Sequence, residues 1–391
     1  TDKSLIFKRH NIVEYFISSE SDRNLVCEML STLSDIERLV SKVATKRIMP
    51  RELFNLNSSL KIIKPLKNKL KKTECKDLNK LIKSLSNCEQ FIQKIDSTLS
   101  ENPPVNINKG NSISSNFSDE LKELRSLSKN TKDFLEEMLK EQSEITKIPS
   151  LKISSNNVFG YYIEVRNTHK DKVPESWIRK QTLVNAERYI TEELKDYETK
   201  ILGAEQRIME LEIKIFDDLL DFCQSHIREI QNNSLIIAQL DCLTSFSNLS
   251  ISKNYVRPEI DDSLDIEIIN GKHPVIESQL PIDKPYIPNS ITLNSEQQQI
   301  IMITGPNMSG KSAILRQTAI ICLLAQIGCF VPAEKLKMGI IDKIFTRVGA
   351  SDNISMGEST FMVEMNETAL ILNNISERSL ILLDEIGRGT S

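Results

Sequence analysis

Residues 303–312 read Ile-Thr-Gly-Pro-Asn-Met-Ser-Gly-Lys-Ser, with glycines at the third and eighth positions and Lys311-Ser312 at the end. This is the spacing of a phosphate-binding P-loop. The apolar run at 300–303 predicts a short, buried parallel strand, and residues 313–327 predict an amphipathic helix after the loop. Backbone N–H groups and the helix N-terminus favour phosphate, Lys311 neutralises its charge and the Ser312 hydroxyl suits Mg²⁺. The stretch therefore predicts a strand, loop and helix that bind a nucleotide.

A second apolar run supplies the carboxylate that a P-loop needs for its metal. Residues 380–383 are Leu-Ile-Leu-Leu, and Asp384 and Glu385 follow directly. We interpret the run as a buried strand of the Walker B type. Asp384 then belongs to the Mg²⁺ shell, and Glu385 is placed to orient or deprotonate an attacking water. Similar runs also begin ordinary helices, so the position of this one after a P-loop gives the interpretation its weight.

The composition excludes several classes of protein. Its 391 residues suggest two to four domains, and 50 Lys and Arg against 54 Asp and Glu leave a net charge of −4, so nucleic acid would have to bind to local basic patches. Seven scattered cysteines without a C-x-x-C pair favour reduced thiols over disulfides or zinc. With no initiator Met, signal peptide or membrane-length apolar run, we expect an internal piece of a cytoplasmic protein.

The first part of the chain is predicted to be helical. Only four of the 12 glycines precede residue 300, residues 1–99 carry helical periodicity, and prolines gather between 258 and 288. We therefore place a domain boundary near residue 255. The lysine-rich stretch 61–80 is interpreted as a solvated helix face, with contact to a DNA backbone as the alternative.

A small β insertion is predicted within the helical part. Residues 150–154 and 159–165 alternate and are rich in β-branched and aromatic side chains, which predicts two antiparallel strands joined by a turn at Asn156-Asn157. Residues 147–188 carry eight Lys and Arg against four acids, a balance that suits phosphate contact, although a solvated β tip remains the alternative. Trp177 is interpreted as packing rather than base stacking. The candidate DNA-backbone residues are Lys152, Arg166, Lys170, Lys172, Arg179 and Lys180.

A long helix is predicted to begin near residue 191. Its apolar residues alternate at spacings of three and four, at Leu194, Tyr197, Ile201, Ala204, Ile208, Leu211 and Ile215. Such heptads favour a helix packed in coiled-coil fashion against a partner. This helix could couple DNA to the nucleotide state, or it could simply hold the β insertion in place.

Together with further short motifs, the stretches described above make the chain resemble the MutS family of DNA mismatch-repair ATPases. The resemblance covers essentially the whole chain. It is carried by residues 34–39 (Ser-Asp-Ile-Glu-Arg-Leu), Arg47, Pro50-Arg51, 159–165 (Phe-Gly-Tyr-Tyr-Ile-Glu-Val), 181–190, 271–274 (Gly-Lys-His-Pro), 304–308, 357–365 (Gly-Glu-Ser-Thr-Phe-Met-Val-Glu-Met) and 384–391 (Asp-Glu-Ile-Gly-Arg-Gly-Thr-Ser).

The resemblance implies roles for individual residues. Asn307 would contact phosphate, and Ser359 would reach the γ-phosphate bound in the other subunit. Tyr286 would lie against adenine, with packing in a proline-flanked loop as the alternative, and His273-Pro274 is interpreted as structural. The implied ATP-binding set is Gly305, Pro306, Asn307, Met308, Ser309, Gly310, Lys311, Ser312 and Tyr286, with Lys311 and Glu385 catalytic and with Ser312 and Asp384 holding Mg²⁺.

The implied fold is α+β and multidomain: a helical core and lever with a small antiparallel β clamp, then an α/β P-loop ATPase domain of the ABC type. The expected segments are core and lever at 1–134 and 197–255, clamp at 135–196 and ATPase at 256–391. The implied partners are ATP, Mg²⁺, mispaired duplex DNA, a second copy of the chain and a MutL-type protein, without a membrane, in the cytoplasm and associated with the nucleoid.

The chain departs from the family pattern at both ends. Neither the family's mismatch-reading domain and connector nor the segment after Walker B is present, so we expect this piece to hydrolyse ATP poorly by itself. Two rivals stay open. One is a chromosome-organising ATPase of the SMC kind, and the other is a MutS-like clamp that acts in recombination or uses ATP only as a switch.

Overall fold

The computed structural model describes the chain except for residues 130, 157–159, 282, 307–308, 348–359 and 388–391. The chain forms two compact units, each assembled from separated segments. Unit 1 comprises Thr1–Leu33, Ile62–Ser86 and Asn232–Ser391, and unit 2 comprises Ser34–Lys61 and Asn87–Gln231. The four domain segments expected from the sequence are drawn on other criteria and stay a prediction. All seven cysteines are unbridged in this structure.

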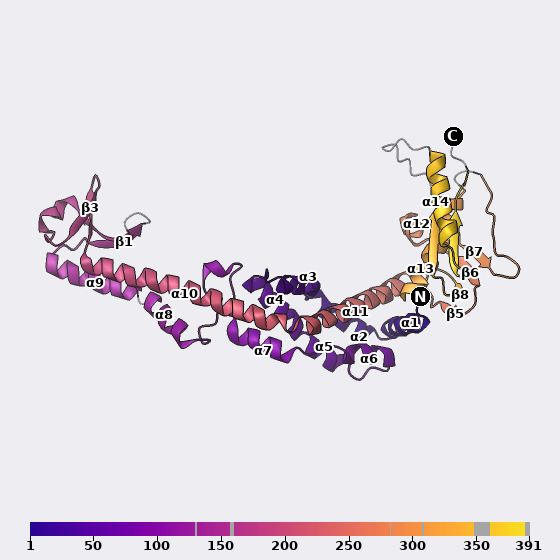
Figure 1. Ribbon diagram of the computed structural model, residues 1–391, viewed down its shortest axis with the longest axis horizontal. Helices are drawn as coiled ribbons and strands as arrows, with labels where there is room; N and C mark the ends of the chain where they lie inside the picture. The colour runs from indigo at the N-terminus through magenta and orange to yellow at the C-terminus, as the bar shows by residue number, and fades with distance from the viewer. Residues whose placement is uncertain (130, 157–159, 282, 307–308, 348–359, 388–391) are drawn as a thin grey trace. The chain divides into compact units, whose positions relative to one another are not determined.

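Unit 2 is built along one long helix, α10 (Glu192–Gln224). The Thr191 side chain caps its start by accepting from the backbone N–H of Leu194 at 3.1 Å, and Glu192 and Glu193 complement the helix dipole there. Figure 1 shows α8 and α9 running beside α10. The predicted heptad helix is thus confirmed. The other helices of the unit are α3 (Ile36–Ala44), α4 (Pro50–Lys61), α7 (Glu89–Thr98), α8 (Asp119–Lys129) and α9 (Thr131–Thr146), with short 3-10 turns at Ile107–Lys109 and Asn167–Lys172.

A four-stranded antiparallel sheet in unit 2 has the order β1-β2-β4-β3. Its strands are β1 (Lys152–Asn156), β2 (Gly160–Arg166), β3 (Ile178–Thr182) and β4 (Ala186–Ile190). The first two strands confirm the predicted pair, whose turn lies partly outside the described residues, whereas β3 and β4 were not predicted. Trp177 is 8% exposed and packs in one apolar cluster with Ile163 and Leu194, which confirms its packing role.

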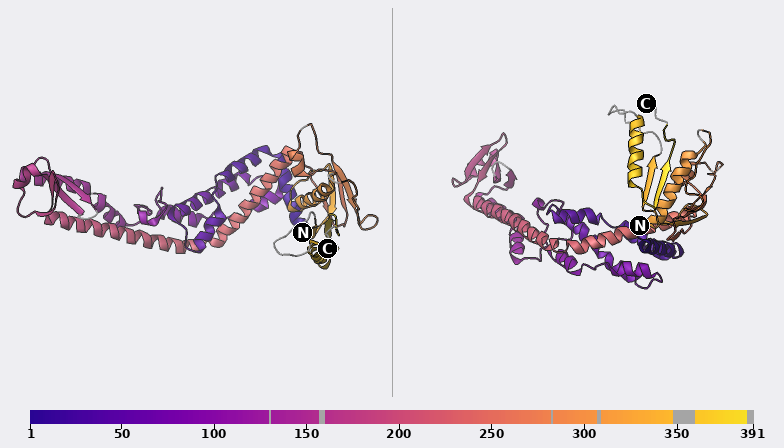
Figure 2. Two further views of the ribbon diagram at one scale, coloured as in Figure 1. Left: turned by 90° about the horizontal axis from the view of Figure 1, so that it is seen from above. Right: turned by 45° about the vertical axis from the view of Figure 1, so that its right-hand side comes forward.

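Unit 1 combines helices with two sheets (Figure 2). A four-stranded sheet has the order β5-β8-β6-β7, and a separate pair, β9 and β10, runs parallel. The strands are β5 (Glu259–Asp261), β6 (Ile266–Gly271), β7 (Asn289–Leu293), β8 (Lys335–Gly339), β9 (Lys343–Arg347) and β10 (Ser379–Leu383). The helices are α1 (Lys3–Ser18), α2 (Glu20–Ser31), α5 (Ile63–Leu70), α6 (Lys76–Lys83), most of α11 (Ile227–Lys253), α12 (Pro274–Gln279), α13 (Lys311–Ile327) and α14 (Thr360–Asn374).

One apolar core joins these parts of unit 1. Ile321 of α13, Leu336 of β8 and Leu380 of β10 are buried in it, and so is Ile6 of α1. Burying one such side chain stabilises a fold by about 1.5–3 kcal/mol. Helix α1 therefore belongs to the core that also holds α13. The helix predicted after the loop and the strand predicted before Asp384 are both confirmed, as α13 and β10. The strand is buried on one face only, because Ile381 and Leu383 are 37% and 40% exposed.

The strand predicted at residues 300–303 is wrong. These residues adopt no regular structure, and Ile300 and Met302 are 85% and 89% exposed. An apolar run forms a strand only where a neighbouring strand takes up its backbone hydrogen bonds. Among the described residues, β10 pairs with β9, and no strand pairs with residues 300–303.

Candidate functional site

The predicted phosphate loop leads directly into α13. Gly310 precedes the helix with a φ of +93°, in the left-handed region that glycine adopts without strain. Across the loop, the Lys311 ammonium donates to the Gly305 carbonyl oxygen at 2.7 Å. The Ser309 hydroxyl donates to the Pro306 carbonyl at 2.7 Å. The loop thus closes on itself at the helix N-terminus, where anions are favoured. Asn307 and Met308 lie outside the described residues.

The hydroxyl of Ser312 and the carboxylate of Asp384 meet at this helix start. Ser312 Oγ donates to Asp384 Oδ2 at 2.5 Å, across 72 positions of sequence. Asp384 sits at the end of β10, where its backbone N–H continues the ladder by donating to the Arg347 carbonyl at 2.8 Å. The structure therefore brings together the two predicted metal ligands from separate elements.

This pair fits Mg²⁺ better than a metal held by protein ligands alone. Among the described residues, no group of three or more His, Cys, Asp or Glu side chains could hold a metal. Mg²⁺ is commonly bound by one or two protein oxygens, with the substrate's phosphates and water supplying the rest. One hydroxyl and one carboxylate beside a phosphate loop match that donor set.

Glu385 follows Asp384 at an abrupt change of backbone direction. Its φ is +49°, in the left-handed region, and the residue is exposed. Shortly after it, the backbone N–H of Gly387 donates to Glu364 of α14 at 2.5 Å. The turn after β10 thus presents Glu385 to solvent beside the predicted metal ligand. Ser359, which the resemblance implies reaches into the other subunit, lies outside the described residues.

Tyr286 lies against the same helix. Its hydroxyl donates to Gln317 Oε1 at 2.9 Å, and Gln317 is fully buried on α13. Burial raises the pKa of Tyr286, so its hydroxyl stays a donor at neutral pH. Sequence reasoning missed Gln317, because a glutamine inside a helix carries no signal of its own. His273 caps α12 by accepting from the backbone N–H of Ile276 at 3.3 Å, which gives it a structural role.

The basic residues of the unit 2 sheet divide into two groups. Arg179 pairs with Glu187 at 3.3 Å. Arg188 pairs with Glu164 at 3.4 Å and lies 4.4 Å from the ring of Tyr162. The other candidates are exposed and form no ion pair with a described residue; they are Lys152, Arg166, Lys170, Lys172 and Lys180. This second group offers positive charge to an outside partner.

None of the helices that the structure describes combines the length and the apolar character needed to cross a bilayer.

Two family models match separate parts of the chain. The model for MutS family domain IV matches residues 116–207, which include the β1–β4 sheet and the start of α10. The model for MutS domain V matches residues 301–391, which include the phosphate loop, α13 and β10.

Curated relatives match along the whole chain. A protein named DNA mismatch repair protein MutS from Flavobacterium psychrophilum is 60% identical over 388 residues, which is 99% of this chain and 45% of the relative. Proteins of the same name from Flavobacterium johnsoniae and Porphyromonas gingivalis are 58% and 51% identical over 390 residues, which is 45% and 44% of their lengths. The chain thus spans less than half the length of these relatives. Because these matches cover essentially its full length, we conclude that the chain belongs to the MutS family.

Proposed function

We propose that the protein binds ATP with Mg²⁺ and hydrolyses it in an α/β P-loop domain at residues 256–391. The observation that carries the proposal is the 2.5 Å contact between Ser312 and Asp384 at the start of α13. It supports the proposal because a P-loop hydroxyl and a strand-end carboxylate are the two protein ligands that such sites give to Mg²⁺.

Each residue of the site has a distinct task. When bound, ATP supplies the phosphoryl group that is transferred and Mg²⁺ offsets its negative charge. The Lys311 ammonium exchanges its hydrogen bond with the Gly305 carbonyl for phosphate oxygens. Ser312 and Asp384 fix the position of the metal, and Glu385 orients and deprotonates the attacking water. Asn307 and the backbone N–H groups from Gly305 to Ser312 hold the phosphates.

The rest of the proposed site comes from Tyr286 and from a second subunit. The Tyr286 ring faces adenine, and its hydrogen bond to Gln317 fixes it to the same helix as the P-loop. Ser359 of one subunit reaches the γ-phosphate held by the other, so the working unit is a homodimer. The roles of Tyr286 and Ser359 follow the family resemblance.

We further propose that the protein binds duplex DNA that carries a mispair. Residues 135–196 act as a clamp, and residues 1–134 and 197–255 act as a helical core and lever that couple the clamp to the nucleotide. The relatives' name, DNA mismatch repair protein MutS, supports this proposal. Lys170 and Lys172 are exposed and form no ion pair with any residue that the structure describes, so they suit sequence-independent phosphate contacts. A MutL-type protein is the proposed downstream partner, and the proposed location is the cytoplasm, in association with the nucleoid.

The nucleotide site is tested by measuring ATP affinity and phosphate release separately. Lys311→Ala should weaken ATP binding about tenfold or more, because a charged hydrogen bond contributes about 1.5–3 kcal/mol. Glu385→Ala should leave affinity within about twofold and lower turnover by about a hundredfold or more, the usual contribution of a general base. Lys335→Ala is the matched control, because Lys335 lies exposed on β8 and, among the residues that the structure describes, forms an ion pair only with Glu267. Wild-type turnover in the Glu385 variant would remove that residue from its role. ATP binding without phosphate release in wild type would favour a clamp that uses ATP as a switch.

DNA binding is tested with heteroduplex and homoduplex DNA over a series of salt concentrations. Lys170→Ala and Lys172→Ala should each weaken binding to both duplexes and reduce the slope of log affinity against log salt by about one. Lys83→Ala, an exposed lysine on α6, should leave both quantities unchanged. Unchanged slopes in the two clamp variants would exclude these lysines as phosphate contacts.

A further inference from the structure

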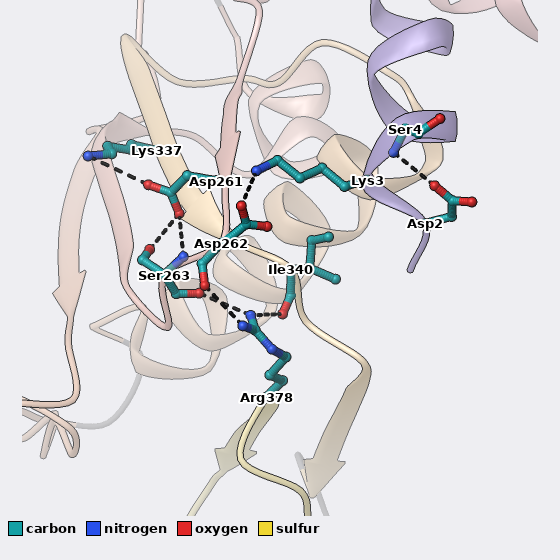
Figure 3. Close-up of polar contacts among 9 residues, drawn as sticks. All are labelled: Asp2, Lys3, Ser4, Asp261, Asp262, Ser263, Lys337, Ile340 and Arg378. Atoms are coloured by element: carbon teal, nitrogen blue, oxygen red, sulfur yellow. Dashed lines mark hydrogen bonds and ion pairs between the residues drawn. The ribbon is translucent and has the colours of Figure 1, made fainter.

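Arg378 joins the start of β10 to a second sheet. Its guanidinium donates to the backbone carbonyls of Asp262 at 2.9 Å and Ser263 at 3.1 Å, in the turn after β5. It also donates to the carbonyl of Ile340, just after β8, at 3.3 Å. Figure 3 shows the three carbonyl oxygens gathered around this one side chain. Arg378 thus fixes the residue before β10 to two segments of the four-stranded sheet.

The turn that receives Arg378 is itself held rigidly. Asp261 accepts from the backbone N–H of Ser263 at 2.9 Å and from its hydroxyl at 2.5 Å, and this hydroxyl is the main cause of the lowered pKa of Asp261. Gly339 packs so closely under the turn that a Cβ would lie 1.8 Å from the Ser263 carbonyl oxygen. Lys337 adds an ion pair to Asp261 at 3.6 Å. The guanidinium is therefore bound to a fixed point rather than to a free loop.

At its other end, β10 delivers Asp384 to the P-loop helix. The strand occupies the positions between Arg378 and Asp384, so one straight segment connects the anchored arginine to the predicted metal ligand. Leu380 and Leu382 set its face against the core, and the parallel ladder with β9 fixes its register against that strand. Since β9 and β10 form a pair separate from the four-stranded sheet, and apolar packing is not directional, the hydrogen bonds of Arg378 fix the start of β10 relative to that sheet. The 2.5 Å contact between Ser312 and Asp384 depends on that position.

We propose that Arg378 is a positioning residue for Asp384: by fixing the start of β10 to the Asp261–Ser263 turn, it holds the carboxylate where it can share Mg²⁺ with Ser312. The inference rests on the proposed ATP·Mg²⁺ site. Arginine suits the role because its planar fork can donate to several carbonyls at once in fixed directions. A lysine at the same position keeps the charge but has no such fork.

The test compares nucleotide affinity with and without the metal. Binding of a fluorescent ATP analogue is measured in EDTA and in Mg²⁺, for wild type, Arg378→Lys and Arg378→Gln. We expect the affinity in EDTA to stay within about twofold of wild type, and the gain produced by Mg²⁺ to fall about tenfold, the equivalent of about 1.4 kcal/mol. A variant that merely folds less well would lose affinity equally in both conditions.

Lys3→Ala is the matched control. Lys3 pairs with the Asp262 carboxylate at 2.7 Å, on the same turn, and Figure 3 marks no hydrogen bond or ion pair between Lys3 and Arg378. It should change neither affinity. If Arg378→Lys keeps the full Mg²⁺ gain while wild type shows one, the positioning role is wrong and the nucleotide site stands. If wild type shows no gain from Mg²⁺, the proposed site fails, and this inference fails with it. Circular dichroism shows which variants are folded, and either folded Arg378 variant suffices for the comparison.

Discussion

Replacing Glu212 on α10 with glutamine should strongly destabilise unit 2, even though this substitution is chemically conservative. The Glu212 side chain is 1% exposed, and its carboxylate accepts from the backbone N–H groups of Asn111 at 3.0 Å and Ser112 at 2.9 Å. It also accepts from Arg125 of α8 at 2.6 Å, and the Arg125 side chain is only 14% exposed. Glu212→Gln removes the charge that compensates this arginine. Breaking a buried pair from one side costs about 3–5 kcal/mol, so we expect a loss near the lower figure, because the amide still accepts one bond.

The assay is urea denaturation, with hydrogen exchange on residues 107–113 as a local probe. Glu210→Gln is the control, because Glu210 lies on the same helix, is 55% exposed and reaches Arg207 only at 3.9 Å. An exposed pair of this kind contributes about 0–1 kcal/mol. Adding Arg125→Gln to Glu212→Gln should recover part of the loss, because no charge is then stranded. If Glu212→Gln matched Glu210→Gln in stability and left exchange at Asn111 and Ser112 unchanged, the reasoning would be refuted.

Three further predictions concern stability. Burial, and to a smaller extent the positive charge of Arg257, lower the pKa of His10 from 6.5 to about 4. Between these two pH values the imidazole is therefore protonated in the unfolded state and neutral in the folded state. The free energy of unfolding should therefore be level above pH 6.5 and fall by about 3 kcal/mol between pH 6.5 and 4, a slope that His10→Gln should reduce in denaturation series across pH. Gly339→Ala should cost about 1–3 kcal/mol through the clash with Ser263, whereas Gly203→Ala, which has open space inside α10, should stabilise by about 0.5–1 kcal/mol. Trp177→Ala should cost about 3–5 kcal/mol in thermal or urea unfolding, and an equal stability of variant and wild type would count against its place in the core.

Local patterns in the sequence predicted the elements that carry their own signal. Helix α13 and strand β10 follow from an amphipathic run and an apolar run, and α10 follows from its heptads. Strand β3 was missed because Ile-Arg-Lys-Gln-Thr at Ile178–Thr182 has no apolar alternation, and four of its five residues are exposed. Its pairing with β4, not its composition, makes it a strand. The reverse error occurred at residues 300–303, where an apolar run lacks a strand to pair with among the described residues.

For the candidate site, contiguous motifs identified the loop and the carboxylates but not the residues that hold them in place. Arg378 and Gln317 act through carbonyl and hydroxyl partners far away in the sequence, at Asp262 and Tyr286. Such contacts produce no periodic pattern in the amino-acid sequence, because the partners come together only in the folded chain. The roles of Ser359 and Asn307 stay predictions, since both residues lie outside the described part of the chain.

The place of α1 in the core of unit 1 has a consequence for how the protein acquires its structure. Lys3 meets Asp262 across 259 positions, and Arg257 pairs with Glu14 of the same helix. During synthesis from the N-terminus, the apolar face of α1 therefore stays exposed until the ribosome has made α13 and the strands of unit 1. Contacts between residues this far apart in the sequence form slowly, because the entropy cost of closing a long loop precedes any stabilisation by the contact. Unit 2 can complete itself in the meantime, so unit 1 should be the last to fold and the first to depend on chaperones.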